Sequence, residues 1–353
     1  MKKNRVNSVD LLRGIMAISV MIYHYTSWSV GGLDASNLWS RFGLYAVTIF
    51  YFISGFSLAY VYWDEVNFKI KGYLIRRFFR IAPLFYFVSI LALASQVLKT
   101  GDVDIVKVFL NFTFLFSVVD PTAYYSTGAW SIGNEMFFYF IFALILISNN
   151  RRAWLYISVF ISLIGVYYFR HVALTPSESL SSQWGVYIDP LNHALCFLLG
   201  VCTYSLREWL QIISKKRIFH FFLISASMII FLYPVQGDRI NLVTGIETVL
   251  MMISSYALFV LFLLNQEKLF FNTKISGFLG DISFSVYLVH PFCWFFIKKV
   301  CLEYGVEKVG VIFWGVSIVF TLIVSFITYQ LVEKTGIAFG KRFIKTSSLN
   351  VKL

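Results

Sequence analysis

Three side chains lie in apolar surroundings and have the types needed for acid–base chemistry: Arg13, His24 and Glu135. Arg13 and His24 are eleven residues apart, which on an α-helix means three turns, roughly 20° of angular drift and about 16 Å of rise. They therefore share one face. Because an isolated cation facing lipid is costly, that face should meet a protein interior or a wet cavity. The alternative is that Arg13 reaches back to the cytoplasmic interface while His24 lies in the opposite headgroup layer.

Glu135 is predicted to lie at the same depth as His24. His24 is near the outer end of the first apolar segment, and Glu135 is near the outer end of the fourth, so both lie roughly 6 Å below the outer boundary. A histidine and a carboxylate at one level suit a general base and the group that orients it. A purely structural pairing of Glu135 with a neighbouring segment is the alternative.

Arg77 and Arg80 are three residues apart and would share one face of a helix. Guanidinium groups bind phosphates through two parallel hydrogen bonds. Together with Arg13 at the same cytoplasmic level, they could bind a phosphate-rich ligand from the cytosol. Their position in a cytoplasmic loop is equally well explained by the general excess of Lys and Arg on the cytoplasmic loops of membrane proteins.

His290 is predicted near mid-membrane, directly before Pro291, which frees a backbone carbonyl and can kink the helix. The histidine is either an interior residue with internal partners or a ligand contact. The sequence contains no HExxH, paired CxxC, GxSxG or glycine-rich phosphate loop, and its cysteines lack metal-ligand spacing. No metal is therefore predicted.

The elements that must position these residues are membrane spans. The chain is 58% hydrophobic and only 14% charged, with a mean hydropathy of +0.73, whereas soluble chains carry about 25% charged residues. We predict an all-α polytopic membrane protein with about ten transmembrane helices. The predicted spans are 9–28, 43–62, 80–98, 131–148, 153–170, 190–206, 218–235, 246–265, 281–298 and 309–332.

The distribution of basic residues sets the orientation. With both termini cytoplasmic, 21 of the 30 Lys and Arg residues lie on cytoplasmic segments and eight lie opposite. This asymmetry follows the positive-inside rule and accounts for the net charge of +12 without nucleic acid. The shorter run 105–119 is predicted to be interfacial or re-entrant. We expect one transmembrane domain over 1–335 and a short basic cytoplasmic tail over 336–353.

Five motifs resemble, in order, those of the membrane-bound acyltransferase 3 family. The first is Asp10-Leu-Leu-Arg13-Gly14, with His24 in the Arg-x10-His spacing. The others are Phe50-Tyr-Phe-Ile-Ser54-Gly55-Phe56, Arg77-Phe-Phe-Arg80-Ile-Ala-Pro83, Trp130-Ser131-Ile-Gly133-Asn-Glu135-Met-Phe-Phe-Tyr139 and Gly280-Asp-Ile-Ser283-Phe284-Ser285-Val-Tyr287-Leu-Val-His290-Pro291. Two positions depart from the family pattern: Gly133 replaces a bulkier residue, and Phe284 replaces a tyrosine.

The resemblance implies transfer of an acyl group, mostly acetyl, from cytoplasmic acyl-CoA to a hydroxyl of a cell-surface or lipid-linked glycan. It also implies a bacterial inner membrane as the location. Arg13, Arg77 and Arg80 would bind the donor, and His24 with Glu135 would be catalytic. Substrate or oxyanion contacts are expected from Ser54, Trp130, Ser131, Tyr139 and His290. The expected partners are acyl-CoA, the glycan acceptor and membrane lipids.

A different class of protein fits part of the pattern. A secondary transporter or channel for a sugar or lipid-linked precursor could use the buried His and Glu as a proton relay. Such proteins are often built from repeated halves with broken helices, and the sequence shows no repeat of clear register.

Overall fold

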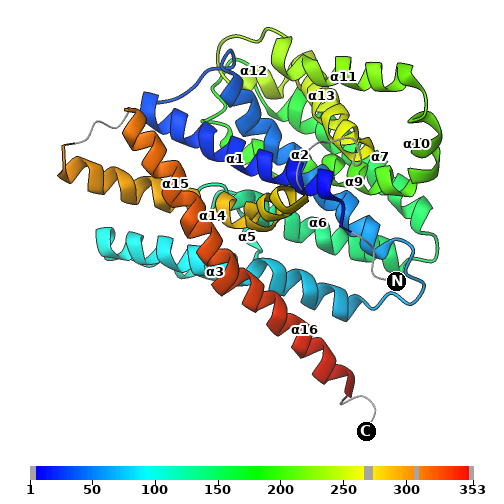
Figure 1. Ribbon diagram of the computed structural model, residues 1–353, viewed down its shortest axis with the longest axis horizontal. Helices are drawn as coiled ribbons and strands as arrows, with labels where there is room; N and C mark the ends of the chain where they lie inside the picture. Colours follow the sequence, from blue (N-terminus) through cyan, green and yellow to red (C-terminus); the bar gives the residue numbers. More distant parts are fainter. Residues whose placement is uncertain (1–4, 266–272, 306–309, 350–353) are drawn as a thin grey trace. The chain divides into compact units, whose positions relative to one another are not determined.

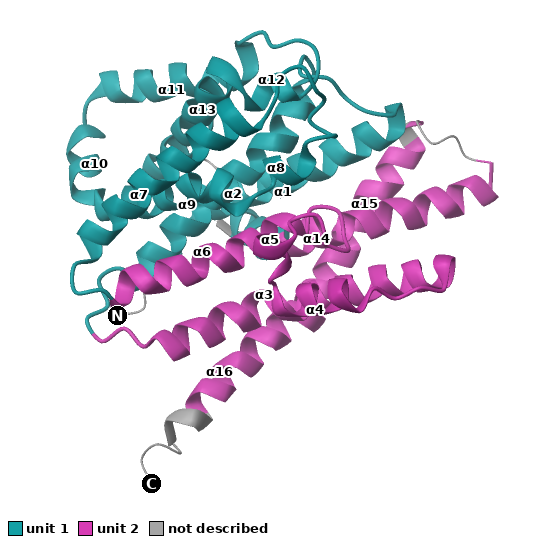
Figure 2. Cartoon of the chain, turned by 180° about the vertical axis from the view of Figure 1, so that it is seen from behind, with its two compact units in different colours: residues 1–66, 148–283 teal, residues 67–147, 284–353 magenta. Residues whose placement is uncertain are grey.

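The computed structural model describes residues 5–265, 273–305 and 310–349 (Figure 1). Within these residues every regular element is an α- or π-helix, and none is a strand. The all-α prediction is therefore confirmed. By internal contacts the chain divides into two compact units (Figure 2), which are Met1–Val66 with Ser148–Ser283 and Asn67–Ile147 with Phe284–Leu353.

The first unit is built from helices of two separate chain segments. They are α1 (Asn7–Val30), α2 (Leu38–Tyr62), α7 (Arg151–Tyr168), η1 (Phe169–Ala173), α8 (Trp184–Tyr187), α9 (Pro190–Ser205), α10 (Arg207–Ile213), α11 (Arg217–Leu232), α12 (Ile240–Val243), α13 (Gly245–Leu264) and the start of α14 (Thr273–Glu303). Helices α1 and α2 lie side by side (Figure 1), and α2 also packs along α9. This arrangement makes α2 the centre of the first unit.

Glycines set the closest helix crossings in the first unit. A Cβ added at Gly55 on α2 would collide with the Phe197 carbonyl of α9, and one added at Gly200 on α9 would collide with the Phe52 carbonyl of α2. Each glycine thus allows the backbone of the other helix to approach closely, as small residues do at helix crossings in membrane proteins. The glycine of the Ser54-Gly55 motif is therefore a packing residue.

Helix α1 meets α14 through two further glycines. A Cβ at Gly14 would lie 2.5 Å from Leu279 Cβ, and a Cβ at Gly280 would lie 2.6 Å from Asp10 Cβ. These glycines come from the first and last motifs of the sequence, so the two motifs form one helix crossing.

The second unit is formed by α3 (Ile70–Thr100), α4 (Ile105–Thr113), α5 (Phe116–Val119), α6 (Trp130–Ile147), the remainder of α14, α15 (Val311–Thr328), η2 (Tyr329–Glu333) and α16 (Lys334–Leu349). Helix α16 packs on α3. A Cβ at Gly336 would collide with Pro83, and one at Gly340 would lie 2.6 Å from Phe79 Cβ. The last predicted span does not end at 332, because helix continues through η2 into α16 across the predicted domain boundary.

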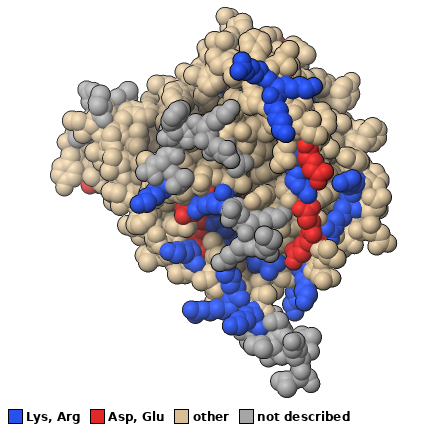
Figure 3. All heavy atoms as spheres, turned by 45° about the vertical axis from the view of Figure 1, so that its right-hand side comes forward, with Lys and Arg blue, Asp and Glu red and all other residues tan. Residues whose placement is uncertain are grey.

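Eight helices in the described part of the chain are long and apolar enough to cross a membrane. They match eight of the ten predicted spans. The predicted spans 9–28 and 218–235 correspond to the more polar α1 and the 16-residue α11. In the view of Figure 3 most of the described surface carries no charged side chain, as lipid contact requires. The protein is thus a polytopic membrane protein, while the number ten and the cytoplasmic termini remain predictions.

The run 105–119 forms two short helices rather than one span. Asp104 caps α4 by accepting from Lys107 N at 2.9 Å, and Phe114, directly after α4, has a left-handed φ of 60°. Neither α4 with nine residues nor α5 with four is long enough to cross a bilayer.

Candidate functional site

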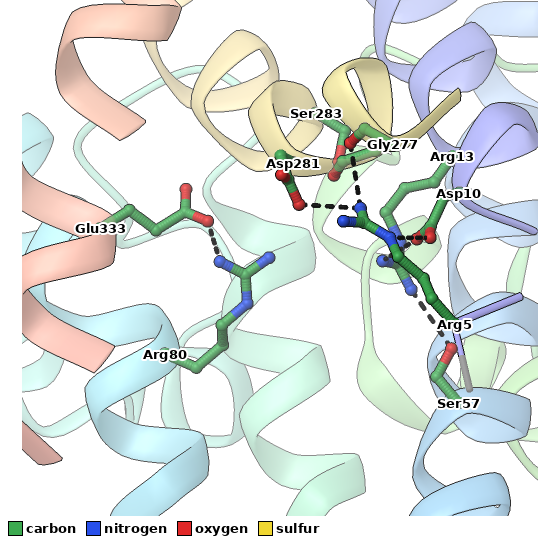
Figure 4. Close-up of polar contacts among 10 residues, drawn as sticks. Arg5, Asp10, Arg13, Ser57, Arg80, Gly277, Asp281, Ser283 and Glu333 are labelled. Carbon is green, nitrogen blue, oxygen red and sulfur yellow. Dashed lines mark hydrogen bonds and ion pairs between the residues drawn. The ribbon is translucent and has the colours of Figure 1, made fainter. Parts of the chain in front are cut away.

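Arg13 is held at the start of α1 by an acidic and a hydroxyl side chain. Its guanidinium lies 3.4 Å from Asp10 Oδ1 and donates to Ser57 Oγ on α2 at 3.2 Å (Figure 4). The Arg13 side chain is 25% exposed, so it is neither sealed in the interior nor extended into the surroundings. The structure therefore fixes the Arg13 guanidinium while leaving part of it open.

Asp10 is shared with a second arginine. Arg5 pairs with Asp10, donates to Asp281 Oδ1 at 2.7 Å and donates to the Gly277 carbonyl at 3.0 Å (Figure 4). Burial lowers the pKa of Arg5, but its bonds to Asp281 and Asp10 outweigh this effect and hold the pKa above its ordinary value. Arg5 thus ties the start of α1 to α14 and neutralises Asp10.

His24 lies near the opposite end of α1 among aromatic rings. Its imidazole stacks on Trp28 with ring centroids 5.0 Å apart and an interplanar angle of 25°, and its centroid lies 4.8 Å from that of Tyr23. His24 is only partly buried. Tyr23 accepts a hydrogen bond from Arg239, which steadies the ring next to the imidazole. The ring stack orients His24 and leaves it accessible.

In the second unit Arg80 pairs with a carboxylate that is completely buried. Arg80 Nη1 donates to Glu333 Oε1 (Figure 4). Glu333 Oε2 accepts from Ser285 Oγ at 3.1 Å. The Arg80 guanidinium also lies 5.7 Å from the centre of the Phe284 ring, which is the position where the family has tyrosine. Glu333 ends the π-helix η2, a type of distortion that often occurs at functional positions.

Arg77 lies on the same helix and contacts a different group. Its guanidinium carbon is 6.0 Å from the centre of the Tyr139 ring, at the limit of a cation–π contact. The Tyr139 hydroxyl in turn donates to Glu135. The structure thus brings three predicted site residues together in one chain of contacts from α3 to α6.

Gly133 allows α5 to pack closely against α6, two residues before Glu135. A Cβ at Gly133 would lie 2.6 Å from Phe116 Cζ and 2.8 Å from Ser117 Cβ on α5. The bulkier residue usual in the family would displace α5, and here α5 occupies that space.

Ser131 and the α14 motif are also joined. Ser131 Oγ is 2.8 Å from the Tyr287 hydroxyl, and both donate to the Gly128 carbonyl, at 2.9 and 3.1 Å. Trp130 is 6% exposed and His290 is fully buried, with Nδ1 3.1 Å from the Val286 carbonyl. Ser131 is therefore committed to positioning the turn before α6.

The predicted site residues divide between the two units. Arg13, His24 and Ser54 belong to the first unit, and the predicted residues on α3, α6 and α14 belong to the second. The pairing of His24 with Glu135 and the joint donor site of Arg13, Arg77 and Arg80 remain predictions. Among the described residues no group of three or more His, Cys, Asp and Glu side chains is placed to hold a metal ion.

Sequence reasoning gave no role to Arg5, Glu333 or Arg170. Arg170 is 1% exposed and donates to Asn192 Oδ1 at 2.8 Å and to Thr248 Oγ1 at 2.5 Å. In the sequence Arg170 only ends the predicted span 153–170, a position typical of an interfacial basic residue. Glu333 lies one residue beyond the last predicted span. The signal that could have found it is that neither proline nor glycine occurs from 332 to 335, so the helix can continue past the predicted end of the span.

Comparison with known proteins agrees with the motifs. A family model described as an acyltransferase domain, that of the acyltransferase 3 family, matches residues 6–330. ORF330 of Acidianus two-tailed virus, whose given name is that of a candidate acetyltransferase, is 27% identical over 291 residues, covering 82% of this chain and 84% of that protein. No solved structure matches the chain. The chain therefore belongs to the acyltransferase 3 family, and it is an integral membrane acyltransferase.

Proposed function

We propose that the protein transfers an acyl group, acetyl in the first instance, from cytoplasmic acyl-CoA to a hydroxyl of a cell-surface or lipid-linked glycan on the opposite side of a bacterial inner membrane. Family membership supports acyl transfer, and the geometry of α1 supports the direction.

One observation carries the proposal. Helix α1 holds a guanidinium near its N-terminal end and an imidazole about 16 Å further along, and both are partly accessible. The charge count predicts that the N-terminal end is cytoplasmic. Separate contacts fix the two groups, since Asp10 and Ser57 hold Arg13 while Trp28 stacks on His24. A donor with an anionic end and an extended thioester arm could place its anionic end near the Arg13 guanidinium and its thioester near the His24 imidazole.

The chemistry at His24 requires one proton transfer in each direction. The imidazole takes the proton from the acceptor hydroxyl, whose oxygen attacks the thioester carbonyl carbon. The C–S bond then breaks, the acyl group stays on the acceptor oxygen, and the departing thiolate takes the proton back from the imidazolium. Alternatively His24 itself attacks the thioester and carries the acyl group before the acceptor does. Glu135 would orient the imidazole in either route.

Arg13, Arg77 and Arg80 would bind the donor. Arg13 and Arg80 keep further N–H groups beyond those that meet Asp10 and Glu333, because a guanidinium has five donors. Ser54, Trp130 and Tyr139 would contact substrate or the oxyanion. Ser131 and the fully buried His290, predicted as contacts from the sequence, would instead position the residues around them through their hydrogen bonds.

The test supplies radiolabelled acetyl-CoA to membrane vesicles that contain the protein and a glycan acceptor. We expect labelled glycan from the natural chain and none from His24→Ala, because removal of a general base or nucleophile costs at least about 100-fold in rate. His220→Ala is the matched control, since His220 lies on α11 outside the proposed site, and it should retain activity.

Two results would overturn the proposal. Full activity in His24→Ala would end the assignment of the imidazole. Movement of an unmodified saccharide across the vesicle membrane, with no label transferred, would show a transporter instead. Label on the polypeptide itself in the absence of acceptor would identify the route through an acyl-histidine.

A further inference from the structure

A pocket of about 460 Å³ lies in the first unit between the end of α2 and the start of α7. It is lined by Trp63, Asp64 and Val66 on one side and by residues 148–152 on the other. It is an open concavity at the surface rather than an enclosed cavity. The charge count of the sequence puts both lining segments on the cytoplasmic side, where a soluble donor would arrive.

Hydrogen bonds fix the walls of this pocket. Arg151 donates from Nη1 to the Trp63 carbonyl at 2.6 Å and from Nη2 to the Glu65 carbonyl at 2.9 Å, so it binds one wall to the other. Asn150 Oδ1 accepts from Ala153 N at 3.1 Å and caps α7. The pocket is therefore formed by two loops that are joined to each other.

Among the described residues, the pocket lining carries two guanidinium groups, Arg151 and Arg152, and one carboxylate, Asp64, so its net charge is positive. In the described part of the chain, no hydrogen bond or ion pair involves the guanidinium of Arg152, which is exposed and lines the pocket. The acidic Asp64 is already engaged, since Oδ2 accepts from the Tyr204 hydroxyl at 2.7 Å and Oδ1 lies 3.3 Å from Arg207. The pocket thus offers a positive centre whose neighbouring carboxylate is neutralised.

This distinguishes Arg152 from the arginines that the sequence suggested. Arg13 and Arg80 each pair with a carboxylate, so only their remaining N–H groups can meet the donor. Arg152 carries no such pairing and is joined in the pocket by the side-chain amide of Asn149, a further hydrogen-bond donor. A guanidinium with an adjacent amide suits phosphate oxygens.

We propose that this pocket binds the phosphate groups of a nucleotide, with Arg152 as the charged contact and Asn149 as the neutral one. The inference rests on the proposed function in one respect, namely that the nucleotide is the phosphate-bearing end of the acyl-CoA donor. Membrane lipid headgroups carry phosphate as well, and they are the other source of the same chemistry.

The experiment measures binding of 3′,5′-adenosine bisphosphate to the full-length protein in nanodiscs of phosphatidylcholine, with and without phosphatidylglycerol. Arg152→Gln should weaken binding about tenfold or more, because a charge-assisted hydrogen bond is lost. The single variant Asn149→Asp should also weaken binding of the bisphosphate, because it places a carboxylate in the pocket. Arg217→Gln, which removes an exposed cytoplasmic cation outside the pocket, should bind as the natural chain does.

Each outcome bears on the proposal. Loss of affinity in Arg152→Gln but not in Arg217→Gln, equal in both lipids, supports a nucleotide site. Unchanged affinity in Arg152→Gln overturns it. Binding abolished by phosphatidylglycerol, together with retention of that lipid through Arg152, assigns the pocket to headgroups and overturns the nucleotide.

Acetyl transfer separates this inference from the proposed function. If the natural chain and Arg152→Gln acetylate glycan with the same KM for acetyl-CoA, the pocket proposal fails while the function stands. If the nucleotide binds through Arg152 but no acetyl is transferred, the pocket stands and the function fails. A KM raised for acetyl-CoA and unchanged for acetyl-pantetheine, which lacks the nucleotide, is the result expected when both hold.

Discussion

Arg80 and Glu333 form an ion pair in which only one partner is exposed at the protein surface. The side chain of Glu333 is 0% exposed, whereas that of Arg80 is 27% exposed. A buried charge left without its partner is costly, while a partly exposed one can be hydrated. The two halves of the pair should therefore respond differently to substitution.

We expect Arg80→Ala to destabilise the protein by about 3–5 kcal/mol, because it leaves the Glu333 carboxylate buried and unpaired. Glu333→Gln should cost less, since the Gln amide oxygen can still accept from Ser285 and Arg80 can turn to water. Thermal unfolding in detergent checks the order of the two variants. Lys71→Ala, at an exposed position of α3, is the control. An equal loss in both variants would contradict the asymmetry.

The same pair shows how far residue chemistry could be predicted from the sequence. Arg80 was identified because its spacing to Arg77 and the following proline form a local motif. Glu333 was not, because its importance arises from burial and from a partner 253 positions away. Arg170 was missed for the same reason, since nothing near it in sequence marks Asn192 and Thr248 as its partners.

At the level of elements, glycine positions control how closely the helices approach. Gly55 lies against the backbone of α9, whereas Gly315 on α15 has no atom of another residue near its would-be Cβ. Both are helical, so alanine gains the same intrinsic preference at each position, up to about 1 kcal/mol. Only at Gly55 must the helices separate to accept the methyl group.

We expect Gly55→Ala to lower the free energy of unfolding by about 1–3 kcal/mol through overpacking. Gly315→Ala should leave stability unchanged or raise it by up to about 1 kcal/mol. Thermal unfolding of the two variants under identical detergent conditions is the measurement. Stabilisation by Gly55→Ala would show that the close crossing of α2 and α9 is not maintained.

Span positions were predictable because length and apolarity are local properties. Eight predicted spans coincide with long apolar helices, and the run 105–119 was set apart by its shortness. The extension of the last helix into α16 was not predicted. It depends on Gly336 and Gly340 fitting against α3, a contact that hydropathy does not encode.

For the whole molecule, orientation in the membrane is the property that the proposed function needs. Acyl transfer across the bilayer requires Arg13 and His24 to face opposite compartments. The charge count predicts cytoplasmic placement for the segment 207–217 and the opposite side for the loop between η1 and α8. This placement remains a prediction.

Labelling of single cysteines in intact cells checks it. A membrane-impermeant maleimide should label Ser177→Cys from outside and Lys216→Cys only after permeabilisation. Both positions are exposed. Cys196, Cys202 and Cys293 are buried, and Cys301, which is partly exposed, is replaced by serine in the background chain and in both variants. The reverse pattern would contradict the proposed direction of transfer.

The fit of α16 on α3 also limits the changes in length that the chain can accept. Gly336 and Gly340 meet Pro83 and Phe79 in fixed register, and the same stretch begins at Glu333, the partner of Arg80. One inserted residue would turn everything after it by roughly 100° and advance it by about 1.5 Å. Alignments of homologous sequences should therefore have no gaps between Glu333, Gly336 and Gly340, although gaps are common where helices are joined by loops.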